Sequence, residues 1–145
     1  MMRVWILPLL FAVAGALVAV GMFAQGSPLE GAVLLVLFLL LASLNSPLIF
    51  PRSISAEEAG RRGAADGRPV VYWRPGCPFC IRLRIGLGRG ARRAHWVNIW
   101  RDPEGAAAVR AVNDGDETVP TVFVGGRPHT NPDPAWVRER LSPTA

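Results

Sequence analysis

Two long stretches without a charged residue dominate the start of this 145-residue chain. Residues 4–24 and residues 31–50 contain no Asp, Glu, Lys or Arg. An uncharged stretch of roughly 20 residues forms a helix about 30 Å long, which matches the hydrocarbon core of a bilayer. The residues between the two stretches, 25–30, include Gly, Ser and Pro and leave room only for a tight turn. The sequence therefore predicts a transmembrane helical hairpin over residues 1–50.

Arginines predict the orientation of this hairpin. Arg3 precedes the first stretch, and Arg52, Arg61 and Arg62 follow the second, whereas the turn has no Lys or Arg. The positive-inside rule places the arginine-bearing ends in the cytoplasm. We therefore expect a two-pass protein of the cell inner (plasma) membrane, with the rest of the chain facing the cytoplasm. A cleaved signal peptide over the first stretch is one alternative, and a soluble domain with residues 4–50 as its core is another.

Nearly all the charge of the chain follows Phe50. The formal net charge is +5, and all 16 basic residues are arginines. They are scattered among Gly, Ala and acidic residues, and only two pairs of arginines are adjacent. A protein that binds nucleic acid concentrates its basic residues on one face or along one helix. This distribution does not favour a nucleic-acid partner.

The chain after residue 50 alternates between strand-like and helix-like patterns. We expect a linker over 51–67 that contains a short helix at the capping box Ser55 and Glu58, and a domain over 68–145. Strands are predicted at 69–73, 95–100, 121–124 and 127–130, and helices at Pro78, Pro103 and Pro134, each after a residue able to cap a helix. The first helix is the least clear, because residues 81–85 alternate like a strand and glycines follow. This order predicts an α/β fold, a four-stranded mixed sheet with about three helices.

The two cysteines of the chain, Cys77 and Cys80, stand at the expected start of that first helix. At a strand-to-helix junction, the amides of the helix N-terminus favour the thiolate of the first cysteine. Cys77 would attack a disulfide, and Cys80, one turn later, would resolve the mixed disulfide. Arg74 adds a positive charge nearby. A structural zinc site needs four ligands, and His95 and His129 are far away in sequence, so we expect no metal site.

Two segments of the soluble part resemble the glutaredoxin family. Residues 70–80 are similar to the family's strand, basic residue and Cys-Pro-x-Cys loop, and Thr118-Val119-Pro120 resembles its Thr-Val-Pro segment, whose cis proline lies against the active-site sulfur. Residues 113–116 and Thr130-Asn131-Pro132 resemble segments of the actinobacterial branch, the mycoredoxins. The resemblance implies a thioredoxin-like (glutaredoxin) fold over about residues 68–141.

The resemblance also implies roles for individual residues. It makes Cys77 and Cys80 catalytic. It implies a thiol- or substrate-binding set formed by Arg74, Pro78, Phe79, Thr118, Val119, Pro120, Thr130 and Asn131. No permanently bound cofactor is expected, and mycothiol or glutathione would act as cosubstrate. The Thr130-Asn131-Pro132 segment favours mycothiol, because the Gly-Gly then Ser/Thr-Asp signature for glutathione is not clearly present.

The expected function is that of a membrane-anchored thiol–disulfide oxidoreductase. It would reduce mixed disulfides of low-molecular-weight thiols or disulfides of proteins, so its expected partners are a small thiol, disulfide-bearing or thiolated proteins, and the membrane. An exported thiol oxidant of inverted topology is one alternative. The other is an iron–sulfur-binding glutaredoxin, in which Cys77 and a small thiol from each of two subunits hold a [2Fe–2S] cluster.

Overall fold

The computed structural model describes residues 3–141, which form two compact units with their boundary between Ile49 and Phe50. The last four residues of the expected 68–145 domain lie outside this range. The elements, in chain order, are α1 (Arg3–Ala24), α2 (Pro28–Asn45), η1 (Pro47–Ile49), α3 (Ala56–Asp66), β1 (Val70–Trp73), α4 (Pro78–Leu87), η2 (Gly88–Arg93), β2 (His95–Asn98), α5 (Pro103–Val112), β3 (Thr121–Val124), β4 (Arg127–Thr130) and α6 (Pro134–Leu141).

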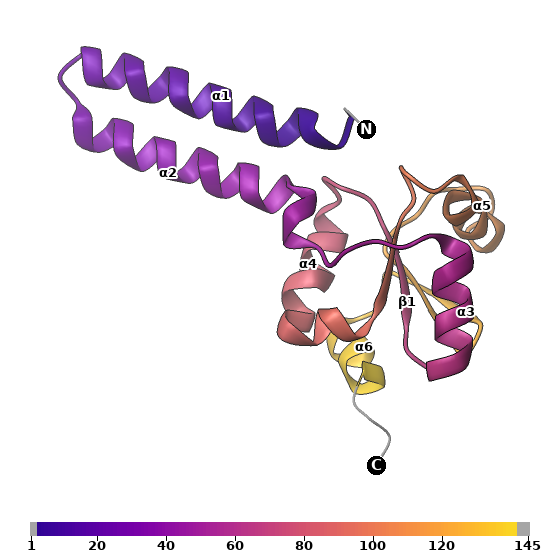
Figure 1. Ribbon diagram of the computed structural model, residues 1–145. Helices are drawn as coiled ribbons and strands as arrows, with labels where there is room; N and C mark the ends of the chain where they lie inside the picture. The colour runs from indigo at the N-terminus through magenta and orange to yellow at the C-terminus, as the bar shows by residue number, and fades with distance from the viewer. Residues whose placement is uncertain (1–2, 142–145) are drawn as a thin grey trace. The chain divides into compact units, whose positions relative to one another are not determined.

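The first unit is a hairpin of the helices α1 and α2, followed by the short 3₁₀ turn η1 (Figure 1). The helix α2 starts earlier than the uncharged stretch, because Pro28 occupies its first turn, where a missing N–H costs nothing. It ends at Asn45, so it does not extend to residue 50. Both helices are long and apolar enough to cross a membrane, by length and composition alone. Most of their apolar side chains are exposed.

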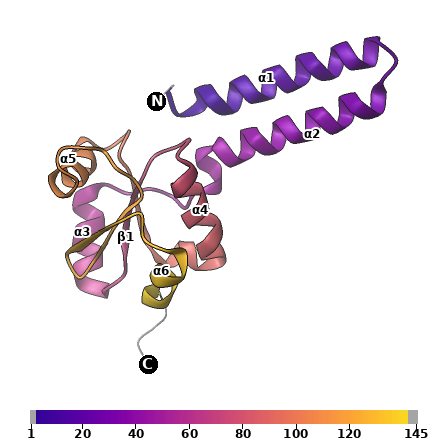
Figure 2. The same ribbon diagram turned by 180° about the vertical axis from the view of Figure 1, so that it is seen from behind.

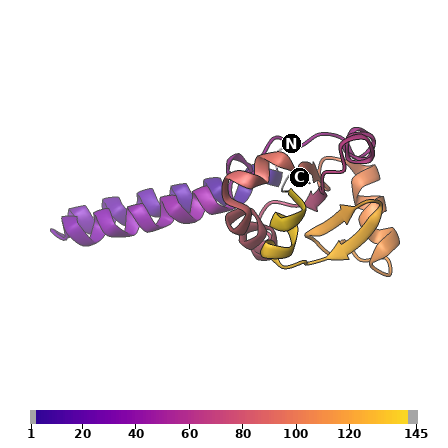
Figure 3. The same cartoon turned by 90° about the horizontal axis from the view of Figure 1, so that it is seen from below.

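The second unit is built on a four-stranded mixed sheet, as the sequence predicts. The strand order is β2-β1-β3-β4, in which β1 pairs parallel with β2 and the other two pairings are antiparallel. Figure 3 shows the antiparallel strands β3 and β4 side by side. All four residues of β1 are buried, as expected for a central strand that is covered on both faces. The strand β2 ends at Asn98, before the expected Trp100, because the Asn98 side chain accepts a hydrogen bond from the Trp100 N–H at 3.0 Å.

Helices cover both faces of the sheet. The helices α4 and α6 lie together on one side, and α3 and α5 lie together on the other (Figures 1 and 2). On this scaffold the N-terminus of α4 follows the carboxyl end of β1, and the start of β3 lies beside that end through the pairing of Tyr72 with Thr121. This arrangement positions the cysteine pair at one edge of the sheet.

The segment 51–67, expected as a linker, contains ordered structure. It forms the helix α3, whose N-cap Ser55 accepts a hydrogen bond from the Glu58 N–H, as the capping box predicts. Ser53 forms a parallel bridge with Trp96 of β2 and accepts a hydrogen bond from the Trp73 indole at 3.0 Å. The segment therefore extends the sheet beyond β2 and covers part of the core.

Three aromatic residues connect the start of this unit to its core. Phe50, the last residue of the expected second span, stacks on Trp73 with ring centroids 3.8 Å apart, and its ring meets Trp96 edge-on. The indole of Trp96 donates to the Ala91 carbonyl at 2.7 Å, so both buried indoles have polar partners. Phe50 thus belongs to the core of the second unit.

Close packing against α6 explains a glycine in α4 that is unfavourable for a helix by propensity. A Cβ on Gly86 would lie 2.5 Å from the Cβ of Pro134, at the start of α6. Glycine is therefore required at this contact, whatever its cost to the helix. The tertiary contact also shows why local pattern alone predicts α4 so weakly.

Gly86→Ala should therefore destabilise the domain by about 1–3 kcal/mol, because the proline ring cannot move aside easily. Gly60→Ala is the matched control, since a Cβ at this exposed position of α3 would meet nothing within 4 Å. The control should stabilise the domain by about 0.5–1 kcal/mol through lower chain entropy in the unfolded state. Guanidinium unfolding of the full chain in detergent, followed by tryptophan fluorescence, measures both changes. Equal effects of the two substitutions would contradict the packing argument.

Candidate active site

Cys77 is the N-cap of α4, and its sulfur replaces the oxygen of an ordinary cap. It accepts a hydrogen bond from the backbone N–H of Cys80, with Sγ 3.4 Å from the nitrogen. Pro78 occupies the first turn, where no N–H is lost. The preceding Gly76 has a φ of 75°, a conformation that favours glycine and lets the chain turn into the helix. The local sequence thus directs the Cys77 sulfur toward the helix N-terminus.

Hydrogen bonding makes the two thiols unequal. The Cys80 side chain donates to the Cys77 sulfur, and this interaction, the largest contribution, lowers the pKa of Cys77 to about 6. Burial opposes the shift, while the backbone N–H groups of Cys80 and Phe79 and the charge of Arg74 add to it. The same pairing, together with complete burial, raises the pKa of Cys80. At neutral pH Cys77 is therefore the thiolate and Cys80 retains its proton.

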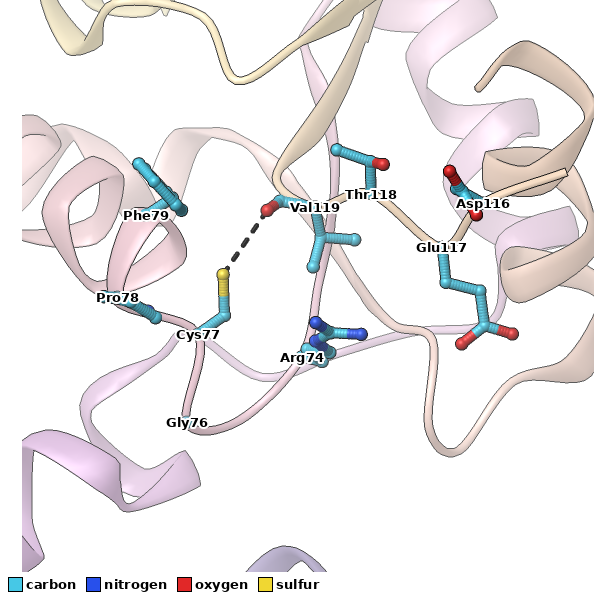
Figure 4. A pocket seen from close by; sticks show the side chains of 9 residues that line it. All are labelled: Arg74, Gly76, Cys77, Pro78, Phe79, Asp116, Glu117, Thr118 and Val119. Atoms are coloured by element: carbon cyan, nitrogen blue, oxygen red, sulfur yellow. Dashed lines mark hydrogen bonds between the residues drawn. The ribbon is translucent and has the colours of Figure 1, made fainter. Parts of the chain in front are cut away.

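The Cys77 sulfur lies against a segment that is distant in sequence. In its thiol form Sγ donates to the Val119 carbonyl at 3.3 Å, which Figure 4 marks with a dashed line. The Val119–Pro120 peptide bond is cis, as the sequence predicts. Val119 and Pro120 are both buried. The Thr-Val-Pro segment therefore forms one wall beside the cysteine.

A pocket of about 460 Å³ is lined by the Cys77 loop and the segment before β3. Five of the residues predicted to bind thiol or substrate line it together with Cys77: Arg74, Pro78, Phe79, Thr118 and Val119. Half of the Phe79 side chain is exposed at this rim (51%), so the pocket has an apolar edge. Figure 4 shows Phe79 on the far side of the sulfur from Thr118. The structure thus brings most of the predicted set together.

Thr130 and Asn131 do not line this pocket. The Thr130 hydroxyl donates to the Asn113 side chain at 2.6 Å, and the Asn131 N–H donates to the Pro120 carbonyl at 2.7 Å. The Asn113 side-chain amide in turn donates to Thr121 Oγ1 at 3.2 Å. These hydrogen bonds connect the end of β4 to both flanks of the Thr-Val-Pro segment. Both residues therefore support the pocket wall from outside the pocket.

Two acidic residues of the pocket were not among the predicted site residues. Asp116 and Glu117 come directly before Thr118 and line the pocket opposite Phe79 (Figure 4). Glu117 forms an ion pair with Arg110 at 2.5 Å, whereas the Asp116 carboxylate has no hydrogen-bond or ion-pair partner within residues 3–141. Their adjacency to the Thr-Val-Pro segment was the available signal.

Both histidines contact side chains that do not line the pocket. His95 Nε2 lies 2.9 Å from a carboxylate oxygen of Asp66, and the His129 ring packs against Trp136 with centroids 4.2 Å apart. Within the described part of the chain, no three His, Cys, Asp or Glu side chains are grouped so that they could hold a metal ion. The pocket itself presents the Cys77 sulfur and the charged side chains of Arg74, Asp116 and Glu117.

The pKa of Cys77 predicts how its alkylation depends on pH. The thiolate is the reactive form, so the rate with iodoacetamide should rise with pH through a midpoint near 6, against about 8.5 for an ordinary thiol. Cys80→Ala should raise this midpoint by more than Arg74→Gln does, because the Cys80 hydrogen bond is the largest contribution and the Arg74 charge the smallest. Mass spectrometry of the alkylated full chain measures the rates. A wild-type midpoint above about 8 would contradict the assignment.

Comparisons with known proteins agree with this geometry. The glutaredoxin family model matches residues 70–129. A putative glutaredoxin of Mycobacterium tuberculosis is 35% identical over 73 residues, which cover 50% of this chain and 87% of the relative. Mycoredoxin 1 of Corynebacterium glutamicum is 32% identical over 77 residues, covering 52% of this chain and 95% of the relative. No solved structure matches the chain significantly. Its family is nevertheless settled: the chain is a mycoredoxin-like member of the glutaredoxins, a family of thiol–disulfide oxidoreductases.

Proposed function

We propose that this protein is a membrane-anchored oxidoreductase that reduces mixed disulfides of a low-molecular-weight thiol, with mycothiol as the favoured cosubstrate, or disulfides of proteins. The observation that carries the proposal is the Cys77 sulfur, which caps α4 with a pKa lowered to about 6 and lines a pocket. The Cys77 thiolate attacks one sulfur of the substrate disulfide, forms a new S–S bond and releases the other sulfur as a thiolate. A second thiolate then attacks the sulfur of the group bound to Cys77, forms a disulfide with it and releases Cys77 as a thiolate.

The pocket residues have complementary roles in this reaction. Arg74 favours the thiolate, and Phe79 gives the substrate an apolar surface beside the sulfur. Thr118 and Val119 form the opposite wall, which Thr130 and Asn131 support from behind. Cys80 acts when the partner is a protein disulfide, because its thiol lies next to Cys77 and can resolve a protein mixed disulfide.

Charge in the pocket favours a neutral small thiol. Among the residues that line it, Arg74 is the one cation, whereas Asp116, the Cys77 thiolate and Glu117, whose partner Arg110 lies outside the lining, are anions. Glutathione has two carboxylates and one ammonium group, so its net charge is negative, while mycothiol consists of neutral sugar, inositol and acetylcysteine groups. The acidic residues therefore support mycothiol over glutathione. The relationship to a mycoredoxin supports the same choice.

Two features support membrane anchoring with the site toward the cytoplasm. The helices α1 and α2 are apolar over lengths that suit a bilayer. Arginines flank the outer ends of the hairpin, and the turn has none. In the cytoplasm the thiols would remain reduced and ready to donate electrons.

The two cysteines should differ in their mutant activities. Cys77→Ser should abolish thiol transfer, because Cys80 is fully buried and protonated. Cys80→Ser should retain activity on a small mixed disulfide and lose it on a protein disulfide that needs resolving. Stopped-flow reduction of both substrate types by the full chain in detergent checks this. Equal loss in the two variants on the small mixed disulfide would contradict the roles.

The acidic residues should set a preference for substrate charge. In the Cys80→Ser background, Asp116→Asn and Glu117→Gln should each speed attack on the anionic 3,3′-dithiodipropionate by roughly two- to threefold at low salt. They should leave the neutral bis(2-hydroxyethyl) disulfide unchanged, and high salt should erase the effect. Asp114→Asn is the matched control, because Asp114 is exposed in the same loop but does not line the pocket. If neither variant changes the rate with the anionic substrate, the proposed preference for substrate charge is wrong.

Topology can be tested with a reporter enzyme that is active only outside the cytoplasm. Fused within the turn at residues 25–30, it should be active, and fused after Ala145 it should be silent, because the arginines keep both outer ends inside. Immunoblotting confirms that both fusions are made. Activity of the fusion after Ala145 would overturn the cytoplasmic orientation and would favour an oxidant.

A further inference from the structure

The net charge of the domain is concentrated on one face of its sheet. The layer formed by α4, η2 and α6 carries seven arginines and one glutamate, whereas α3 and α5 on the other face carry three arginines and four acidic residues. The seven are Arg82, Arg84, Arg89, Arg92, Arg93, Arg138 and Arg140. We call the layer of α4, η2 and α6 the basic face. These arginines are scattered in the sequence, and the fold brings them to one face of the sheet.

Several arginines of the basic face are available for a partner. Arg89, Arg92 and Arg93 are exposed, and none of them has an ion-pair or hydrogen-bond partner within residues 3–141. On the opposite face, by contrast, Arg61 and Arg62 both pair with Glu58. The basic face therefore has unneutralised positive charge, which attracts an anionic surface.

An exposed apolar side chain lies among these charges. Ile85 on α4 is 62% exposed, the highest value for a large hydrophobic side chain in residues 50–141. Arg82 comes one turn before it and Phe79, also exposed, one turn before that, so the three share one side of the helix. Apolar side chains between arginines are typical of surfaces that dock at the headgroup level of a bilayer.

The proposed anchoring brings the domain to a lipid surface. Four residues join Asn45, at the end of α2, to Phe50 in the domain core, and this five-residue step spans at most about 18 Å. A membrane that holds α2 is thus always close to the domain. Each arginine near an anionic bilayer strengthens binding by about 1 kcal/mol, which is about fivefold.

We propose that the basic face of the domain docks on anionic lipid headgroups, with Arg89, Arg92 and Arg93 supplying the charge and Ile85 inserting between headgroups. The inference rests on the proposed membrane anchoring. Docking would hold the Cys77 pocket near the membrane surface and would direct the enzyme toward disulfides of membrane proteins.

The test places one nitroxide label on the full chain in nanodiscs. Ile85→Cys, in a Cys77→Ser/Cys80→Ser background, carries the label on the basic face, and Val112→Cys on α5 carries it on the opposite face. In discs of phosphatidylcholine with one third phosphatidylglycerol, collisions of the Ile85 label with a water-soluble nickel reagent should fall several-fold relative to pure phosphatidylcholine. The Val112 label should collide equally in both lipids.

Two adjacent arginine pairs supply matched charge variants. Arg92→Gln/Arg93→Gln should lower the ratio of docked to free domain by about 25-fold, and Arg61→Gln/Arg62→Gln should leave it unchanged. Hydrogen exchange over residues 78–93 of the unlabelled chain gives the same comparison if a labelled variant does not fold.

Three other results would contradict the docking proposal. Failure of the chain to elute with discs of either lipid would overturn the anchoring and the docking together. Elution with discs but equal accessibility of the Ile85 label in both lipids would overturn the docking alone. Protection that appears only in native membrane vesicles, and not with anionic lipid, would assign the basic face to an acidic protein and would also overturn the proposal.

Discussion

The antiparallel pairing of β1 with β3 is the interaction on which the site depends. Tyr72 pairs with Thr121, so the loop that leaves β1 and the segment that enters β3 meet at one edge of the sheet. This register places the Cys77 sulfur 3.3 Å from the Val119 carbonyl, although 42 residues separate them in the chain. A slip of one residue would turn every side chain of β3 to the other face and would move Val119 away from the sulfur. In the proposed reaction the Cys-x-x-Cys loop supplies the nucleophile, and the sheet supplies the wall against which a substrate would lie.

That wall is held in place by hydrogen bonds from outside the pocket. Asn113, at the end of α5, bonds to Thr121 at the start of β3 and to Thr130 at the end of β4. Asn131 adds a bond to the Pro120 carbonyl. Both short segments that resemble mycoredoxins beyond the Thr-Val-Pro motif take part in this network. The support that Asn113, Thr130 and Asn131 give to the wall accounts for these positions without contact to the thiol substrate, whereas Asp116 of the first segment lines the pocket itself.

The sequence predicts the features of this protein that local chemistry decides. The helix starts at Cys77-Pro78 and Asp102-Pro103 can be predicted from the sequence, because capping and the proline at the first turn act within four residues. The mixed sheet covered by helices follows from strands that alternate with helices, whereas the strand order comes from the structure. Features that depend on contacts between distant residues cannot be predicted from the local sequence. Gly86 weakens the helical pattern of α4, and only its contact with Pro134 explains it. Asp116 joins the site because the pairing of β3 brings its loop to Cys77, and the ordered packing of residues 51–67 depends on Trp73 and Trp96.

The Cys77 sulfur caps α4 and, in the proposed reaction, is also the nucleophile, so the two cysteines have different roles. Because the pKa of Cys77 in the folded protein, about 6, is below its unfolded value of about 8.5, its thiolate stabilises the fold fully above that unfolded value. This contribution is lost as the pH falls through 6.

A disulfide removes the negative charge that the N-terminus of α4 stabilises, which favours the reduced form. A low pKa also makes Cys77 a good leaving group when a small thiol attacks the substrate sulfur of the mixed disulfide. Cys80, buried and with a raised pKa, competes poorly for that step. Under the proposed function, Cys77 alone would exchange with small-thiol mixed disulfides, and Cys80 would serve the slower resolution of protein disulfides.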